Sequence, residues 1–222
     1  MKGVLFDVDG TLVDSNYLHV LAWWQAFRQA DVDVPMAAIH RCVGMGGGRL
    51  VEELLDDGRD RSGDEQIKAA HGAVFSTYWP SLRRFDGAKE LLERAAAEGL
   101  AVVLASSAEE AELSVLRRVI DADGSITAAT SSADANNSKP APDILQAALD
   151  AAGLRAADTV FVGDAVWDIQ AAGELGIPCI GLETGGTMAQ ILTQAGALEV
   201  YRNPQDLLEH FSESALGGLL RV

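Results

Sequence analysis

The stretch that decides the fold is GVLFDVDGT, residues 3–11. Its first half is a short apolar run, which is the pattern of a strand buried in a parallel sheet. Asp7 and Asp9 end that run, and residues two apart face the same side of an extended chain. Two carboxylates so close raise each other's cost of ionisation unless a cation or a shared proton relieves it. The pattern suits one nucleophile and one proton carrier, although it is equally found in ordinary turns and calcium loops.

Outward from this run, apolar strand patterns alternate with helical ones. Further strands are expected at residues 100–105, 159–162 and 178–182. Helices are expected at residues 87–98, 109–120, 143–152 and 168–175. This alternation is typical of an α/β fold with a doubly wound parallel sheet.

The segment between the first strand and Phe85 carries only helical patterns, at residues 16–30, 35–41, 49–57 and 64–79. We therefore expect a helical cap domain at residues 15–85, inserted into a discontinuous core of residues 1–14 and 86–222, with hinges at 14–15 and 85–87. An insert beside the carboxyl end of a strand lies where α/β sheets bind ligands.

Composition and charge limit the partners. With 222 residues and 48% hydrophobic content the chain can bury a full core, and its formal charge is −16. Nucleic acid and anionic membranes need a basic surface, so neither is expected as a partner. Cys42 and Cys179 have the spacing of neither a disulfide framework nor a zinc site, and no apolar stretch approaches the length of a membrane span. The expected location is the cytoplasm, and the oligomeric state, monomer or homodimer, stays open.

Three further motifs carry polar side chains that could act together with Asp7 and Asp9. Ser106 and Ser107 follow a predicted strand, Lys139 precedes a proline, and GDAVWD at residues 163–168 follows another strand. Each has an ordinary alternative, because serines and Asp164 also cap helices and a lysine before proline is commonly a solvated turn residue. Together they bring hydroxyls, an ammonium and two more carboxylates to one edge of the sheet.

In order and spacing these motifs resemble those of the haloacid dehalogenase superfamily, which are Asp-x-Asp-x-Thr, a strand-end Ser or Thr, a Lys, and an acidic pair. The likeness is to members with a type-1 helical cap, such as phosphoglycolate phosphatases and β-phosphoglucomutase-like proteins. It implies Mg²⁺ held by Asp7, the Asp9 backbone carbonyl and Asp164, and a phosphoryl group held by Ser106, Ser107 and Lys139. Asp168 and Thr11 would brace these groups from outside the metal's direct ligands. Asp7 would be the nucleophile, and Asp9 the general acid and base, a role favoured if its pKa lies above that of Asp7.

The cap carries candidates for substrate contact. His19 and Trp23 are four residues apart and share one helix face. Gly46 and Gly47, in the glycine run at residues 44–48, either present backbone N–H groups to an anion or form a tight turn. Arg49 follows this run, displaced by it from the place where the mutases hold a second phosphate.

The sequence thus predicts a phosphatase that acts on a small phosphorylated metabolite through an aspartyl-phosphate. Three alternatives remain open. They are β-phosphoglucomutase-like phosphoryl transfer, 2-haloacid dehalogenation, and a non-catalytic phosphate-sensing regulatory protein.

Overall fold

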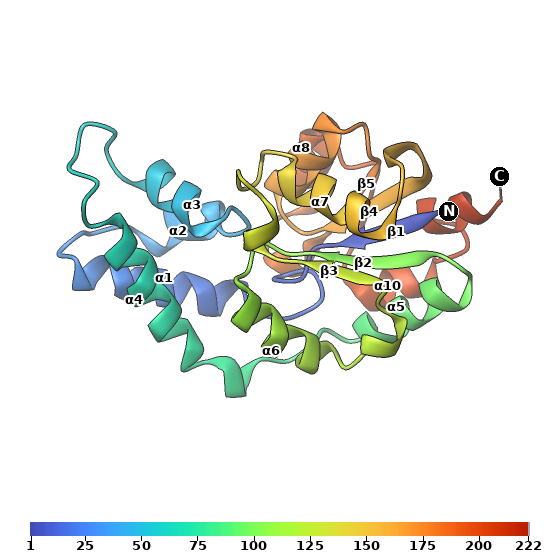
Figure 1. Ribbon diagram of the computed structural model, residues 1–222, viewed down its shortest axis with the longest axis horizontal. Helices are drawn as coiled ribbons and strands as arrows, with labels where there is room; N and C mark the ends of the chain where they lie inside the picture. Colours follow the sequence, from blue (N-terminus) through green and yellow to red (C-terminus); the bar gives the residue numbers. More distant parts are fainter. Residues whose placement is uncertain (222) are drawn as a thin grey trace.

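The computed structural model describes residues 1–221. A sheet of six parallel strands forms one half of the molecule, and a group of helices lies at its other end (Figure 1). The strands are β1 Gly3–Phe6, β2 Ala101–Ala105, β3 Ala128–Thr130, β4 Thr159–Gly163, β5 Cys179–Leu182 and β6 Glu199–Tyr201. Their order is β3-β2-β1-β4-β5-β6, so β1 is central and pairs in parallel with both β2 and β4. This confirms the predicted fold class, while β3 and β6 were not predicted.

Helices cover both faces of the sheet because its strands are apolar on both faces. They are α5 Ala88–Ala97, α6 Glu110–Ile120, α7 Asp143–Ala152, α8 Val166–Glu174, α9 Ala189–Ala195, α10 Pro204–Glu209 and α11 Ala215–Leu220. Val4 and Phe6 of β1 belong to the core under α5, α6, α10 and α11, whereas Leu5 belongs to the core under α7, α8 and α9. Such alternation follows from the two-residue period of a strand.

The remaining helices are α1 Asn16–Gln29, α2 Met36–Cys42, α3 Gly47–Leu54 and α4 Asp64–Ser76. They have a hydrophobic core of their own, centred on Phe27, Ile39 and Leu50. Helix α3 begins two residues before the predicted start, so Gly47 and Gly48 belong to its first turn. Short 3₁₀ turns lie at Trp79–Ser81, Asp123–Ser125, Ser132–Asp134, Ala156–Asp158 and Glu183–Gly185.

The chain leaves and re-enters the sheet half through one hydrogen-bonded ribbon. The Asp14 N–H donates to the Arg83 carbonyl at 2.9 Å, and the Phe85 N–H donates to the Leu12 carbonyl at 3.0 Å. An antiparallel bridge joins Val13 and Arg84 between them. The ribbon coincides with the predicted hinges, and the domain division at residues 15 and 85 stays a prediction. Among residues 1–221, no helix has the length and apolarity to cross a membrane.

Candidate active site

Asp7 stands at the centre of the sheet's carboxyl edge. Its N–H donates to the Val162 carbonyl at 2.9 Å, which extends the pairing of β1 with β4 by one residue, and its side chain is buried. The chain then turns, with the Leu12 and Val13 N–H groups donating to the Val8 carbonyl. Gly10 makes this turn possible because its φ is +76°, in the left-handed region that favours glycine.

Lys139 is fully buried and lies between two carboxylates. Its Nζ is 2.6 Å from Asp7 Oδ1 and 2.7 Å from Asp168 Oδ1. Burial alone would lower the pKa of Lys139, but Asp168 and Asp7 raise it above its ordinary value, so the side chain is an ammonium. Asp168 Oδ2 accepts the N–H groups of Asp164 at 3.1 Å and of Ala165 at 3.0 Å. Asp168 therefore links Lys139 to the loop that carries Asp164, because it interacts with both.

Asp164 is held on both of its oxygens. Thr11 Oγ1 donates to Oδ1 at 2.7 Å, and Asn16 Nδ2 donates to Oδ2 at 2.9 Å. Burial raises the pKa of Asp164 well above its ordinary value, and Asp168 and Asp7 raise it further. The bracing role of Thr11 stays a prediction. Asn16 was not predicted, because an asparagine that opens a helix is usually explained as a local capping residue.

This cluster suits a divalent cation. One oxygen each of Asp7, Asp164 and Asp168 lies within 4.8 Å of the others. Three carboxylates and one ammonium leave a formal charge of −2 in a buried place, which a divalent ion would balance. Carboxylate oxygens are hard donors of the kind Mg²⁺ prefers. Asp168 Oδ2 accepts two backbone N–H groups and its Oδ1 faces the Lys139 ammonium. Each Asp164 oxygen accepts a single uncharged donor and keeps a lone pair, so Asp164 and Asp7 are the side chains that could hold the ion.

Asp9 contacts Ser15, which precedes α1, and His19 within that helix. Its Oδ1 accepts Ser15 Oγ at 2.6 Å and lies 3.2 Å from His19 Nε2. Burial would raise the pKa of Asp9, but these contacts with His19 and Ser15 lower it below its ordinary value. Burial raises the pKa of Asp7 to about 7. This order is the opposite of the one that would favour Asp9 as the general acid, because the hydrogen bonds around Asp9 favour its charged form.

A ladder of stacked rings supports His19. Its ring centroid is 3.8 Å from that of Phe75, and the His71 centroid is 3.9 Å from that of Trp23. His19 Nδ1 lies 3.1 Å from His71 Nε2. Burial lowers the pKa of His71 well below its ordinary value, as does the charge of His19. His71 was missed, although Lys68, His71 and Phe75 have the spacing of one helix face.

The two serines of the second motif have different surroundings. Ser106 is buried, and its Oγ accepts the Ala108 N–H at 3.1 Å. Ser107 faces the cavity that also contains Asp7 and Asp9. Ser107 thus lines the same cavity as Asp7 and Asp9, while the Ser106 hydroxyl accepts a hydrogen bond within the loop before α6.

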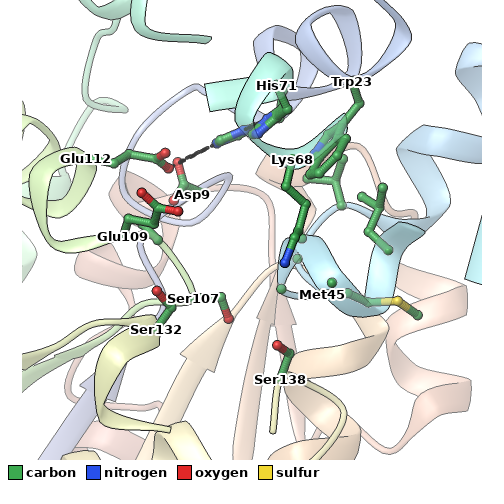
Figure 2. A pocket seen from close by; sticks show the side chains of 18 of the residues that line it. Asp9, Trp23, Met45, Lys68, His71, Ser107, Glu109, Glu112, Ser132 and Ser138 are labelled. Atoms are coloured by element: carbon green, nitrogen blue, oxygen red, sulfur yellow. Dashed lines mark hydrogen bonds and ion pairs between the residues drawn. The ribbon is translucent and has the colours of Figure 1, made fainter. Parts of the chain in front are cut away.

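A cavity of about 280 Å³ lies between the carboxyl edge of the sheet and the group of helices α1 to α4. Its floor and one wall come from the sheet half, and the opposite wall from the cap helices (Figure 2). The lining includes Asp7, Asp9, Ser107, Glu109, Glu112, Ser132, Ser138, His19, Trp23, residues 44–48, Lys68 and His71.

The glycine run forms part of the contact between the two halves. A Cβ added at Gly46 would collide with the Ser138 side chain, so this close approach requires glycine. Gly47 lies against Trp23, and the run lines the cavity. Arg49, by contrast, is outside the cavity, half-exposed and 3.9 Å from Glu52. Lys68 of α4 is the cationic cap residue that faces the cavity (Figure 2).

Comparison with known proteins places these features among hydrolases. A family model described as haloacid dehalogenase-like hydrolase matches residues 1–176. A crystal structure of a hydrolase from Pseudomonas syringae is 31% identical, with a TM-score of 0.91 and coverage of 96% of this chain and 99% of that one. Phosphoglycolate phosphatase from Yersinia pestis is 27% identical, over 96% of this chain and 91% of its own length. The chloroplastic protein SUPPRESSOR OF QUENCHING 1 of Arabidopsis thaliana is 30% identical over 88% of this chain, which spans 19% of that much longer protein.

Proposed function

The chain belongs to the haloacid dehalogenase-like hydrolases, and from this premise we propose that it is a Mg²⁺-dependent phosphatase of small phosphate monoesters. The observation that carries the proposal is Asp7, buried at a strand end between the Lys139 ammonium and Asp164, with Asp9 two residues further on. The similarity to phosphoglycolate phosphatases supports phosphate monoesters as the substrate class.

In the first half of the proposed reaction, an Asp7 oxygen attacks phosphorus and the bond from phosphorus to the ester oxygen breaks. The departing oxygen takes a proton from Asp9 and leaves as an alcohol. His19 Nε2 lies 3.2 Å from Asp9 Oδ1, so an imidazolium at His19 can pass Asp9 the proton it delivers. Lys139 fixes the Asp7 carboxylate, and its charge lies close to the phosphoryl oxygens as charge spreads over them.

In the second half, Asp9 takes a proton from water as the water oxygen attacks the phosphorus of the aspartyl-phosphate. The bond to Asp7 breaks, and inorganic phosphate leaves. Mg²⁺ would be held by Asp7, Asp164 and the Asp9 backbone carbonyl, and would supply positive charge to the phosphoryl oxygens. Ser107, which lines the cavity beside these carboxylates, can donate a hydrogen bond to the same oxygens.

The test is hydrolysis of p-nitrophenyl phosphate by the purified chain with and without Mg²⁺. We expect turnover that EDTA abolishes and that Asp7→Asn reduces by roughly 10³-fold or more, because the nucleophile is removed. Asp57→Asn removes the same charge at a position whose side chain is 92% exposed, and it serves as the control. Wild type with no activity on a broad panel of phosphate esters would contradict the proposal. Conversion of a hexose 1-phosphate that depends on a bisphosphate activator would instead favour the mutase alternative.

A further inference from the structure

The two walls of the cavity differ in charge. On the core side, Glu109 and Glu112 lie beside Asp9 at the start of α6 (Figure 2). On the opposite side, Lys68 is the single lysine or arginine among the described residues that line the cavity, and Glu65 on the same helix pairs with it. The leaving-group side of the cavity therefore carries an acidic surface that Lys68 does not balance.

The two glutamates face the cavity without a strong partner of their own. The Glu109 side chain forms no hydrogen bond or ion pair with another residue of 1–221. Glu112 Oε1 lies 3.6 Å from His19 Nε2, and the Glu112 side chain is 15% exposed. The positive charge of His19 is already shared with Asp9 at 3.2 Å. Burial raises the pKa of Glu112 to about 7, against the opposing effect of His19, so this carboxyl is fully ionised only above neutral pH. In its ionised form a carboxylate only accepts hydrogen bonds, so this wall is complementary to hydroxyl or ammonium donors.

The same wall disfavours a second anion in the substrate. The metal site and Lys139 stand at Asp7, where the phosphoryl group reacts, so they neutralise that group and not the far end of the ester. A carboxylate at the far end would lie against Glu109, which is exposed, and Glu112, whose side chain is 15% exposed. Placing like charges together costs most where water is largely excluded, which here is at Glu112. A cavity of about 280 Å³ is near the lower limit for small-molecule sites, so the leaving group has little room to turn its charge away.

Resting on the proposed phosphatase function, we infer that this chain selects phosphate monoesters whose leaving group presents hydroxyl or ammonium donors to Glu109 and Glu112. Esters that carry a second acid group are poor substrates. The specificity is then different from that named for the phosphoglycolate phosphatases to which the chain is similar, because phosphoglycolate carries a carboxylate.

Two matched pairs of esters test the inference. Ethanolamine phosphate is compared with phosphoglycolate, and glycerol 3-phosphate with 3-phosphoglycerate, so that each pair exchanges a donor for a carboxylate at similar size. We expect kcat/KM to be at least about tenfold higher for the donor-bearing member of one or both pairs. A preference confined to the first pair identifies the ammonium as the recognised donor, and one confined to the second identifies the hydroxyl.

Variants then connect the preference to the wall. Glu109→Gln and Glu112→Gln should each reduce the preference about fivefold or more, mainly through faster hydrolysis of the acidic esters. Glu110→Gln removes the same charge from the same turn of α6 but outside the cavity, and should leave the ratio unchanged. Because Glu112 also contacts His19, Glu109→Gln is the decisive variant if Glu112→Gln loses activity on every ester.

The outcomes separate the two levels of the proposal. Efficient hydrolysis of phosphoglycolate and 3-phosphoglycerate, with ratios that Glu109→Gln does not change, would overturn the specificity and leave the phosphatase function intact. A lack of turnover on p-nitrophenyl phosphate and on all four esters would overturn both.

Discussion

Replacement of Asp168 by asparagine tests how the buried charges of the site are balanced. The carboxylate serves two sets of donors, because Oδ1 lies 2.7 Å from Lys139 Nζ and Oδ2 accepts two backbone N–H groups. An asparagine has one acceptor oxygen and one donor NH₂ group, so it can satisfy only one of these sets. In either orientation its NH₂ group faces another donor in a place that is 1% exposed.

The size of the effect follows from these contacts. Loss of one hydrogen bond to a charged group costs about 1.5–3 kcal/mol, and the buried donor–donor contact adds to it. Lys139 keeps Asp7 at 2.6 Å, so the loss stays below that of a fully orphaned buried charge. We expect the free energy of unfolding to fall by about 2–4 kcal/mol. The local formal charge also changes from −2 to −1, so the affinity for Mg²⁺ should fall by about 10- to 100-fold.

Two measurements check this expectation. Urea unfolding in EDTA gives the change in stability, and phosphatase activity titrated with Mg²⁺ gives the change in metal affinity. Asp57→Asn, at the surface, should alter neither quantity. The reasoning about charge balance is refuted if Asp168→Asn unfolds within about 0.5 kcal/mol of wild type and reaches half-maximal activity at the same Mg²⁺ concentration.

Three further perturbations have distinct expected results. Asn16→Ala removes one hydrogen bond to Asp164, a carboxylate that could hold the ion. It should raise the Mg²⁺ concentration for half-maximal activity about tenfold, with near-normal kcat at saturation. An unchanged titration curve would argue against a role of Asn16 in orienting Asp164. Gly46→Ala should lower kcat/KM by tenfold or more, since its Cβ collides with Ser138, whereas Gly48→Ala has open space and should not; Ser138→Gly should restore the activity of Gly46→Ala. His71→Phe tests how stability depends on pH. Burial lowers the folded-state pKa of His71, so on acidification the unfolded chain takes up this proton before the folded chain does. The free energy of unfolding of the wild type should therefore fall as the pH drops below about 6.5, by at most about 1.4 kcal/mol per pH unit. Urea unfolding between pH 7 and pH 5 should show a smaller acid loss in His71→Phe than in wild type, and parallel curves would contradict this assignment.

The central part of the fold could be predicted because its strands are continuous apolar runs. Strands β1, β2, β4 and β5 are buried on both faces, and that requirement is visible in the sequence. Strands β3 and β6 are three residues long, half-exposed and at the sheet edges, so neither has such a run. Their pairing depends on neighbours that are distant in sequence.

The residues of the candidate site also fall into two groups, those that could be proposed from the sequence and those that could not. Asp7, Asp164 and Asp168 could be proposed from the sequence because they follow buried strands, and Lys139 because it completes the order of motifs that the chain resembles. Asn16, Lys68, His71 and Glu112 were missed because they reach the site from helices. Only the packing of α1, α4 and α6 brings Asn16 to Asp164 and the other three to the cavity. Arg49 was a candidate by its place in sequence, but the start of α3 at Gly47 directs it outside the cavity. Helical side chains depend on rotation about the helix axis, which sequence spacing near a glycine run does not determine.

The ribbon that joins Asp14 to Arg83 and Leu12 to Phe85 gives the chain a modular plan. Because the outgoing and returning strands are already hydrogen-bonded to each other, everything between them is topologically a single large loop on an otherwise continuous core. Such a loop can be lengthened, shortened or exchanged between homologues without altering the connections of the sheet. The wall of the cavity that the segment from α1 to α4 forms can thus be exchanged, in evolution or by engineering, while Asp7 and Lys139 keep their places.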